Sequence, residues 1–137
     1  MKHVALRAFV EVDLPVLDRF GTDPDVAGAF QWTGFADPQS RRRRFAEDGF
    51  LGERSSAVAV TVDGAVAGRA SWEAADRGGP AGGCYGIGLT LLPDHRGHGT
   101  GTKAHRLLVD HLFRFTRAHR LEAFTDAENI AEQRALE

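Results

Sequence analysis

The run RGHGTG at residues 96–101 decides the fold, because it stands between a predicted strand and a predicted helix. An apolar run over residues 84–92 predicts the strand, and Pro93 ends it. The helix is expected from about residue 99 to residue 119, with these apolar positions: Leu107, Leu108, Leu112, Phe113 and Phe115. Glycines let backbone N–H groups converge, and a helix start adds unpaired donors and a positive dipole end. The segment therefore predicts a phosphate- or pyrophosphate-binding turn, with a plain helix-capping turn as the alternative.

Two familiar phosphate-binding patterns do not fit this segment. A Walker loop fails because Lys103 comes one position too late. The dinucleotide pattern G-x-G-x-x-G begins with Gly97 and Gly99 but has Thr102 in place of the third glycine. Asp126 follows the next predicted strand, where a ribose-binding acid would stand, so a dinucleotide-binding domain remains the weakest of three readings.

A third pattern, [RQ]-x-x-G-x-[GA], is met in full by Arg96, Gly99 and Gly101. It is preceded by IGLTLLP at residues 87–93, and a second block, NIAEQRALE, follows at residues 129–137. The two blocks are separated by a predicted helix and a predicted strand. In this order they resemble the GNAT acyltransferase superfamily, and most of all its branch of bacterial ribosomal-protein N-terminal acetyltransferases.

The resemblance implies an α/β (α+β) fold with a mixed, mostly antiparallel central sheet flanked by helices. It implies one N-acetyltransferase domain over residues 1–137, incomplete at the C-terminus because the family normally continues into two more strands. Those strands are either absent or supplied by another subunit, which leaves a homodimer open. The implied activity is transfer of acetyl from acetyl-CoA to a primary amine, by direct attack in a ternary complex. The acceptor is a small molecule or a protein N-terminus.

The resemblance also assigns the contacts with acetyl-CoA. The main chain of the strand would pair with pantetheine, amides of the glycine loop would hold the pyrophosphate, and an asparagine of the second block would bind the cofactor arm. Several converging charge-assisted N–H bonds make such a site physically sensible. The implied cofactor-binding residues are Leu89, Thr90, Leu91, Arg96, Gly97, His98, Gly99, Thr100, Gly101, Thr102 and Asn129.

The catalytic residues are less well marked. Transfer to an amine needs a neutral amine, a polarised thioester carbonyl and a proton for the departing thiolate. Relatives often have a glutamate where Gly86 stands, a tyrosine at the place of Leu136 or a serine at that of Glu132. We therefore predict Glu73 as the base and Tyr85 or Glu132 as proton carriers. Ordinary structural roles for all three, with positioning and water completing catalysis, are the alternative.

The remaining elements alternate between strands and helices. Asp63-Gly64 is a two-residue hairpin signal between two strands. Residues 21–37 and 74–83 are rich in turn-forming residues and are expected as loops. The other expected elements are strands at 4–9, 57–62, 65–72 and 121–125 and helices at 13–20, 38–48 and 129–137.

Composition bounds the class of protein. A chain of 137 residues fits one domain. Seventeen Lys and Arg against nineteen Asp and Glu give a net charge of −2, which argues against a nucleic-acid partner. No signal peptide or membrane-length apolar run is readable, so we expect a soluble cytoplasmic protein without membrane contact. The single Cys84 excludes an intramolecular disulfide.

Three other clusters of residues draw attention. The run Arg41–Arg44 is expected as a solvated helix face, paired at i,i+4 with Glu47 and Asp48, although it would also attract an acidic acceptor. The histidines lack the i,i+4 spacing of a helical zinc site, so no metal is predicted. Three aromatic residues in one loop are expected either to border the acceptor pocket or to seal the core: Phe30, Trp32 and Phe35.

A second functional reading is an acyl-CoA-binding module without turnover.

Overall fold

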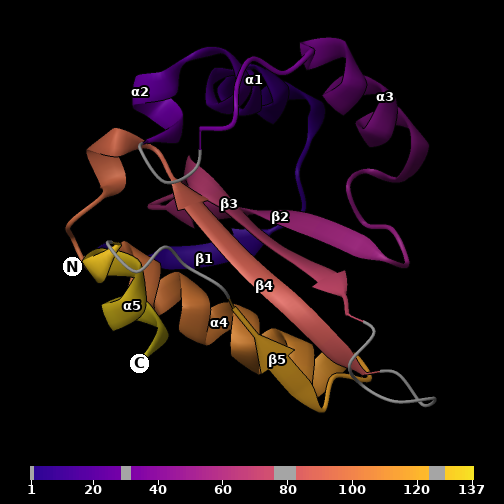
Figure 1. Cartoon of the computed structure of the whole chain (residues 1–137), viewed down its shortest axis with the longest axis vertical. Coiled ribbons are helices and arrows are strands. Elements are labelled where there is room, and N and C mark those ends of the chain that lie inside the picture. Colours follow the sequence, from indigo (N-terminus) through magenta and orange to yellow (C-terminus); the bar gives the residue numbers. More distant parts are fainter. Residues whose placement is uncertain (1, 29–31, 76–82, 124–128) are drawn as a thin grey trace.

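The computed structural model describes residues 2–28, 32–75, 83–123 and 129–137. The centre of this part is a five-stranded sheet in the order β1-β2-β3-β4-β5, in which only the β4–β5 pair is parallel. The strands are β1 (Val4–Arg7), β2 (Ser55–Val62), β3 (Ala65–Ala74), β4 (Cys84–Leu91) and β5 (Arg120–Glu122). The helices are α1 (Leu14–Thr22), α2 (Pro24–Ala27), α3 (Pro38–Asp48), α4 (Thr100–Phe115) and α5 (Ile130–Leu136). The mostly antiparallel sheet flanked by helices is therefore confirmed (Figure 1).

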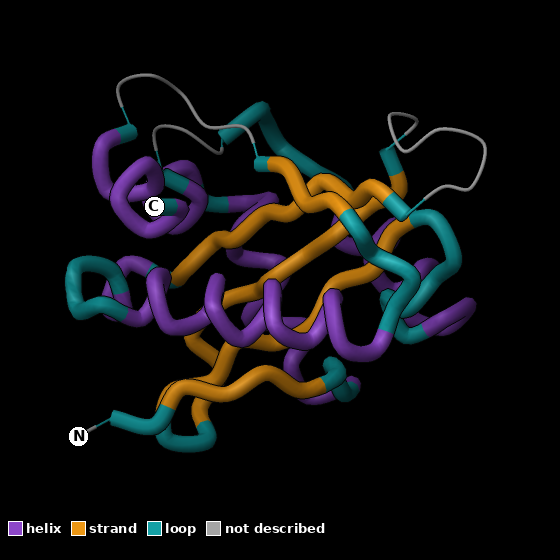
Figure 2. Tube along the Cα trace, turned by 90° about the horizontal axis from the view of Figure 1, so that it is seen from below, coloured by secondary structure: helices purple, strands orange, loops and turns teal. Residues whose placement is uncertain are grey.

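Helices cover both faces of the sheet, because side chains of each strand point alternately to the two sides. The first three helices lie on one face, and α4 runs across the other (Figures 1 and 2). Phe9, Leu17 and Phe50 belong to the core on the first face. Val60 and Leu108 belong to the core under α4. The sheet is thus held from both sides, and β4 lies between the two layers.

Only one stripe of α4 is buried. Ala104, Leu108 and Leu112 repeat every four residues and are fully buried against the sheet. Three predicted apolar positions are instead exposed: Leu107, Phe113 and Phe115. The prediction was wrong there because it counted apolar residues without their helical angle, and a stripe at i, i+4 and i+8 leaves these three outside. In the described part of the chain, no helix combines the length and apolarity that crossing a membrane requires.

Several boundaries differ from the sequence prediction. The predicted loop at residues 21–37 contains the short helix α2, which Asp23 caps by accepting a hydrogen bond from the Asp25 amide. The hairpin at Asp63 and Gly64 is confirmed, with both residues at positive φ. The helix predicted to reach residue 119 ends at Phe115. The predicted residues Asp126 and Phe30 lie outside the described residues.

Asp13 anchors the start of α1 to β1. Its carboxylate accepts two hydrogen bonds from the Arg7 guanidinium, at 2.7 and 3.1 Å, and a third from the Val10 amide at 2.9 Å. Asp13 is 4% exposed. The hydrogen bond from Arg7 lowers the pKa of Asp13 below its ordinary 3.8, the amide and the Arg7 charge lower it further, and burial opposes them. The ionised form therefore stabilises the fold.

We predict that Asp13→Asn lowers the free energy of unfolding by about 1–3 kcal/mol near neutral pH. Because the folded-state pKa lies below the unfolded one, this contribution is present above pH 3.8 and disappears as the pH falls through the folded-state value. Urea unfolding of wild type and variant across acid pH measures the difference. A difference that stays constant down to about pH 2 would contradict the role of the ionised carboxylate.

Candidate functional site

The segment between β4 and α4 presents a row of unpaired backbone donors. Gly97 and Gly99 have φ values of 77° and 78°, a left-handed conformation that glycine adopts without strain. Gly99 caps the helix without a side chain, and the Lys103 amide donates to its carbonyl at 3.2 Å. The amides of Thr100, Gly101 and Thr102 therefore precede the first intrahelical hydrogen bond. The positive end of the dipole of α4 lies at the same place.

These donors open into a cleft of about 430 Å³ between the ends of β4, α2, α4 and α5. The cleft is lined by all the predicted cofactor-binding residues except His98 and Thr100. Thr100 is buried beneath the helix start, whereas His98 is exposed. The lining of the cleft includes Leu89 and Leu91, which make one wall apolar, and the start of α4, which makes another wall rich in backbone N–H. A long ligand with an anionic part and an apolar part fits this lining.

The edge of β4 is open along the cleft. Its pairing with β5 covers Cys84–Gly86 only. In the described part of the chain no strand pairs with Ile87–Leu91 on that side. Apart from the Leu91 carbonyl, which accepts a hydrogen bond from Arg96, the outward-facing N–H and C=O groups of this segment are therefore available to an extended ligand, which would bind as an additional strand does.

Arg96 binds two main-chain carbonyl groups. Its Nε donates to the Leu91 carbonyl at 3.1 Å, and its Nη2 donates to the Val26 carbonyl. A Cβ atom at Gly28 would lie 3.4 Å from both terminal nitrogens, so glycine leaves room for this guanidinium. Arg96 lines the cleft but also ties the glycine loop to α2 across the end of β4. Sequence reasoning missed this second role, because neither carbonyl is marked by a side-chain type.

Asn129 both caps α5 and lines the cleft. Its Oδ1 accepts a hydrogen bond from the Glu132 amide at 3.2 Å and caps α5. The side-chain oxygen is thereby occupied, which leaves the Nδ2 amide as the group that faces a ligand in the cleft. The same residue fixes the start of α5 and offers a donor.

Glu132 also lines the cleft, but it is bound to α4. Its Oε1 lies 2.7 Å from the Nε2 of His105, which is 4% exposed. The Nδ1 atom of His105 is buried and has no hydrogen-bond partner in the described structure. A neutral His105 that donates from Nε2 to Glu132 leaves Nδ1 as the unpaired acceptor. The pair joins α4 to α5 beside the cleft.

A second hollow lies on the sheet face opposite α4. This groove of about 750 Å³ is lined by Ser71, Glu73, Gly86 and Gly88, among other residues. The register pairs Ser71 with Gly88 and Glu73 with Gly86, so the two glycines leave the floor of the groove without β4 side chains. Glu73 is exposed there. The groove and the cleft lie on either side of β4, because Gly88 lines the groove and its neighbour Leu89 lines the cleft.

The other predicted residues lie outside both hollows. Tyr85 alternates with Gly86 and therefore belongs to the α4 face of the sheet, and it lines neither the cleft nor the groove. Trp32 and Phe35 pack edge to face at 5.2 Å and also line neither hollow. Phe35 is 83% exposed, so it does not seal the core.

Among the described residues no group of three or more His, Cys, Asp or Glu side chains is placed to hold a metal ion.

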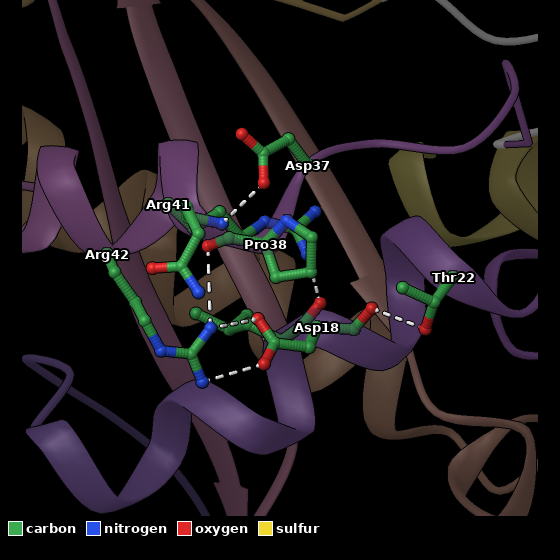
Figure 3. A network of polar contacts seen from close by, with 8 residues as sticks. Asp18, Thr22, Asp37, Pro38, Arg41 and Arg42 are labelled. Atoms are coloured by element: carbon green, nitrogen blue, oxygen red, sulfur yellow. Dashed lines mark hydrogen bonds and ion pairs between the residues drawn. The ribbon is translucent and has the colours of Figure 1, made fainter.

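Only part of the run Arg41–Arg44 is a solvated face. Arg43 is exposed, as predicted, but lies 3.7 Å from Asp37 instead of pairing with Glu47. Arg42 binds both carboxylate oxygens of Asp18, at 3.1 and 2.8 Å, as Figure 3 shows. Arg41 donates to a main-chain carbonyl of α1. The sequence prediction was wrong for these arginines, because α3 packs beside α1 and uses them to bind it. The predicted i,i+4 pair between Arg44 and Asp48 is confirmed at 3.3 Å.

Comparison with known proteins gives a consistent result. The family model described as an acetyltransferase (GNAT) domain matches residues 3–137. A crystal structure of the aminoglycoside acetyltransferase AAC(6')-Ib with coenzyme A matches with a TM-score of 0.78 and 21% identity, over 98% of this chain and 81% of that one. A spermidine N-acetyltransferase SpeG chimera from Vibrio cholerae and hSSAT matches with a TM-score of 0.79 and 13% identity, over 97% and 76%. These likenesses show the fold. No curated protein matches.

Proposed function

Because the chain belongs to the GNAT acetyltransferase family, we propose that it moves acetyl from acetyl-CoA to a primary amine by direct attack in a ternary complex. The observation that carries this proposal is the row of unpaired N–H groups at the start of α4, which opens into a cleft beside β4, with a second groove on the other side of the same strand. A donor in the cleft and an acceptor in the groove would approach each other beside Gly88.

The proposed donor contacts follow from the lining of the cleft. The amides from Gly97 to Thr102 would hold the diphosphate of acetyl-CoA, with the dipole of α4 favouring its charge. The main chain of Leu89–Leu91 would pair with the pantetheine arm, and the Nδ2 of Asn129 would donate to the same arm. Similar structures that hold coenzyme A or acetyl-CoA support this assignment.

The proposed chemistry uses few side chains. Acetyl-CoA, when bound, supplies a thioester carbonyl carbon; a C–N bond to the acceptor forms there and the C–S bond breaks. Glu73, exposed in the groove, would take the proton that the acceptor ammonium must lose. The nitrogen loses a second proton as the amide forms, and the departing thiolate takes up one, so the reaction releases one proton in all. Glu132, which lines the cleft and is bound to His105, would relay one from solvent, with Tyr85 as the alternative.

A second candidate function is an acyl-CoA-binding module without turnover. The observation that favours it is Gly86, which stands in the groove where relatives often have a glutamate, so this position supplies no base. The carboxylates that do line the groove are Glu73 and Glu122. The finer parts of the proposal are one acetyltransferase domain over the whole chain, a cytoplasmic location, and an acceptor that is a small amine or a protein N-terminus. A homodimer and the ribosomal-protein branch stay open within it.

The first prediction from this proposal concerns binding and turnover together. Acetyl-CoA at 100 times its Kd is expected to stabilise the fold by about 2.7 kcal/mol, whereas NADH at the same concentration has no effect. A thiol assay with a panel of amines is expected to show release of CoA that depends on the amine. Stabilisation by acetyl-CoA without release on any amine would favour the binding module. Stabilisation by NADH alone would contradict both.

The second prediction isolates charge at the glycine loop. Gly99→Asp and Gly99→Asn have side chains of nearly equal shape, both tolerate positive φ, and a Cβ atom there meets nothing within 4 Å. The aspartate places a negative charge against the diphosphate, so we expect CoA to bind to Gly99→Asp about 10- to 100-fold more weakly than to Gly99→Asn. Calorimetric titration of the two folded variants measures the ratio. Equal affinities would contradict the proposal that the diphosphate binds at this loop.

The third prediction concerns the base. Glu73→Gln is expected to lower kcat/KM by about 10²-fold near neutral pH, because a glutamine cannot accept the ammonium proton. The loss should shrink as the pH rises toward the pKa of the acceptor amine, where less of the proton remains to be removed. Glu47→Gln, which makes the same chemical change on the exposed side of α3, serves as the control. A loss that is independent of pH, or no loss, would exclude Glu73 as the base.

A further inference from the structure

Arg69 lies on the same sheet face as the acceptor groove. It stands two residues before Ser71 and four before Glu73 on β3, so the three side chains point to the same side. Arg69 lines the groove and also a smaller cavity of about 150 Å³ beneath α3. The two hollows share Arg44, Phe50 and Ala57 as well, so they are neighbours and Arg69 borders both.

The positive charge of Arg69 has no counter-ion in the described structure. Arg44 is paired with Asp48, and Arg41 donates to the main-chain carbonyl of Leu17. Arg69 makes no hydrogen bond or ion pair with any of the described residues. Burial lowers the pKa of its guanidinium, and the neighbouring charge of Arg41 lowers it further, with no carboxylate acting in the opposite direction. A charge that is largely buried is normally paired, so this guanidinium is suited to bind an anionic group that enters the groove.

We propose that Arg69 binds an anionic group of the acceptor, a carboxylate or a phosphate, and that the substrates are small amines which carry such a group. This inference rests on the acetyl transfer proposed above. The acceptor would then lie along β3 with its ammonium group near Glu73 and its anion against Arg69. Opposite charges at the two ends of the groove fix one orientation of a zwitterion.

The size of the groove agrees with a small acceptor. Arg69 and Glu73 are four residues apart, so their Cα atoms are separated by about 13 Å, and both residues line the groove. That span suits a molecule with a few bonds between its amine and its anion. Polycationic acceptors such as spermidine, which the name of one similar structure mentions, would instead place positive charge against Arg69.

The test is the rate of CoA release with matched pairs of amines. One pair is 4-aminobutyrate and its amide, the other is glucosamine 6-phosphate and glucosamine, and spermidine is the cationic probe. We expect the anionic member of at least one pair to show a kcat/KM about tenfold or more above that of its partner. The pair in which the preference appears identifies the anion as a carboxylate or a phosphate. Equal rates within both pairs, or a preference for spermidine, would overturn the inference.

Variants then assign the preference to one side chain. Arg69→Gln is expected to raise KM for the anionic amine about 10- to 100-fold with little change in kcat, and to change kcat/KM for the uncharged partner far less. Arg69→Lys should restore part of the affinity. Arg43→Gln, on the exposed side of α3, removes the same charge away from the groove and should have no effect. An anion preference that persists in Arg69→Gln would overturn the role of Arg69.

Two outcomes separate this inference from the function on which it rests. No CoA release with any amine of the panel would contradict acetyl transfer and this inference with it. Release that is independent of the anion would contradict this inference alone. Stabilisation of Arg69→Gln by acetyl-CoA, equal to that of wild type, shows that the variant is folded and that its donor cleft is intact.

Discussion

The row of unpaired amides at the start of α4 is the constraint on which the rest of the structure depends. A helix start becomes an anion site only when it is held still and kept open to a ligand. The buried stripe of α4, from Ala104 to Leu112, fixes the helix against the sheet. Left-handed glycines then turn the chain so that the amides face the cleft. Arg96 holds the other side of the turn by binding the ends of β4 and α2.

The cleft, proposed for the donor, and the groove, proposed for the acceptor, differ in the kind of group that they present. Both border β4. The cleft offers backbone donors and the helix dipole, which suit a diphosphate irrespective of side chains. The groove offers charged side chains of β3 above a floor that Gly86 and Gly88 leave empty. Close packing of β3 on β4 keeps this floor in place, since a Cβ atom at Gly68 would lie 2.1 Å from the Thr90 carbonyl oxygen. Under the proposed function, specificity for the acceptor would therefore depend on β3, whereas binding of the donor would depend on the loop.

The sequence predicted what is encoded locally. The order of strand, glycine turn and helix follows from RGHGTG and its apolar neighbours, and the hairpin follows from Asp63 and Gly64. Contacts between distant segments were not predictable, because no local pattern marks them. Arg96 meets Val26 across 70 positions, and Arg42 meets Asp18 across 24. The run of four arginines looked solvated for that reason. Arg69 likewise carries no motif and becomes notable only where folding leaves it without a counter-ion.

A crystal structure of the protein with coenzyme A tests the central claim most directly. The account predicts that the diphosphate oxygens accept hydrogen bonds from amides between Gly97 and Thr102, at about 2.8 Å, with the pantetheine arm along the open edge of β4. A diphosphate bound elsewhere, or a loop whose amides turn inward and leave no room for an anion, would contradict it.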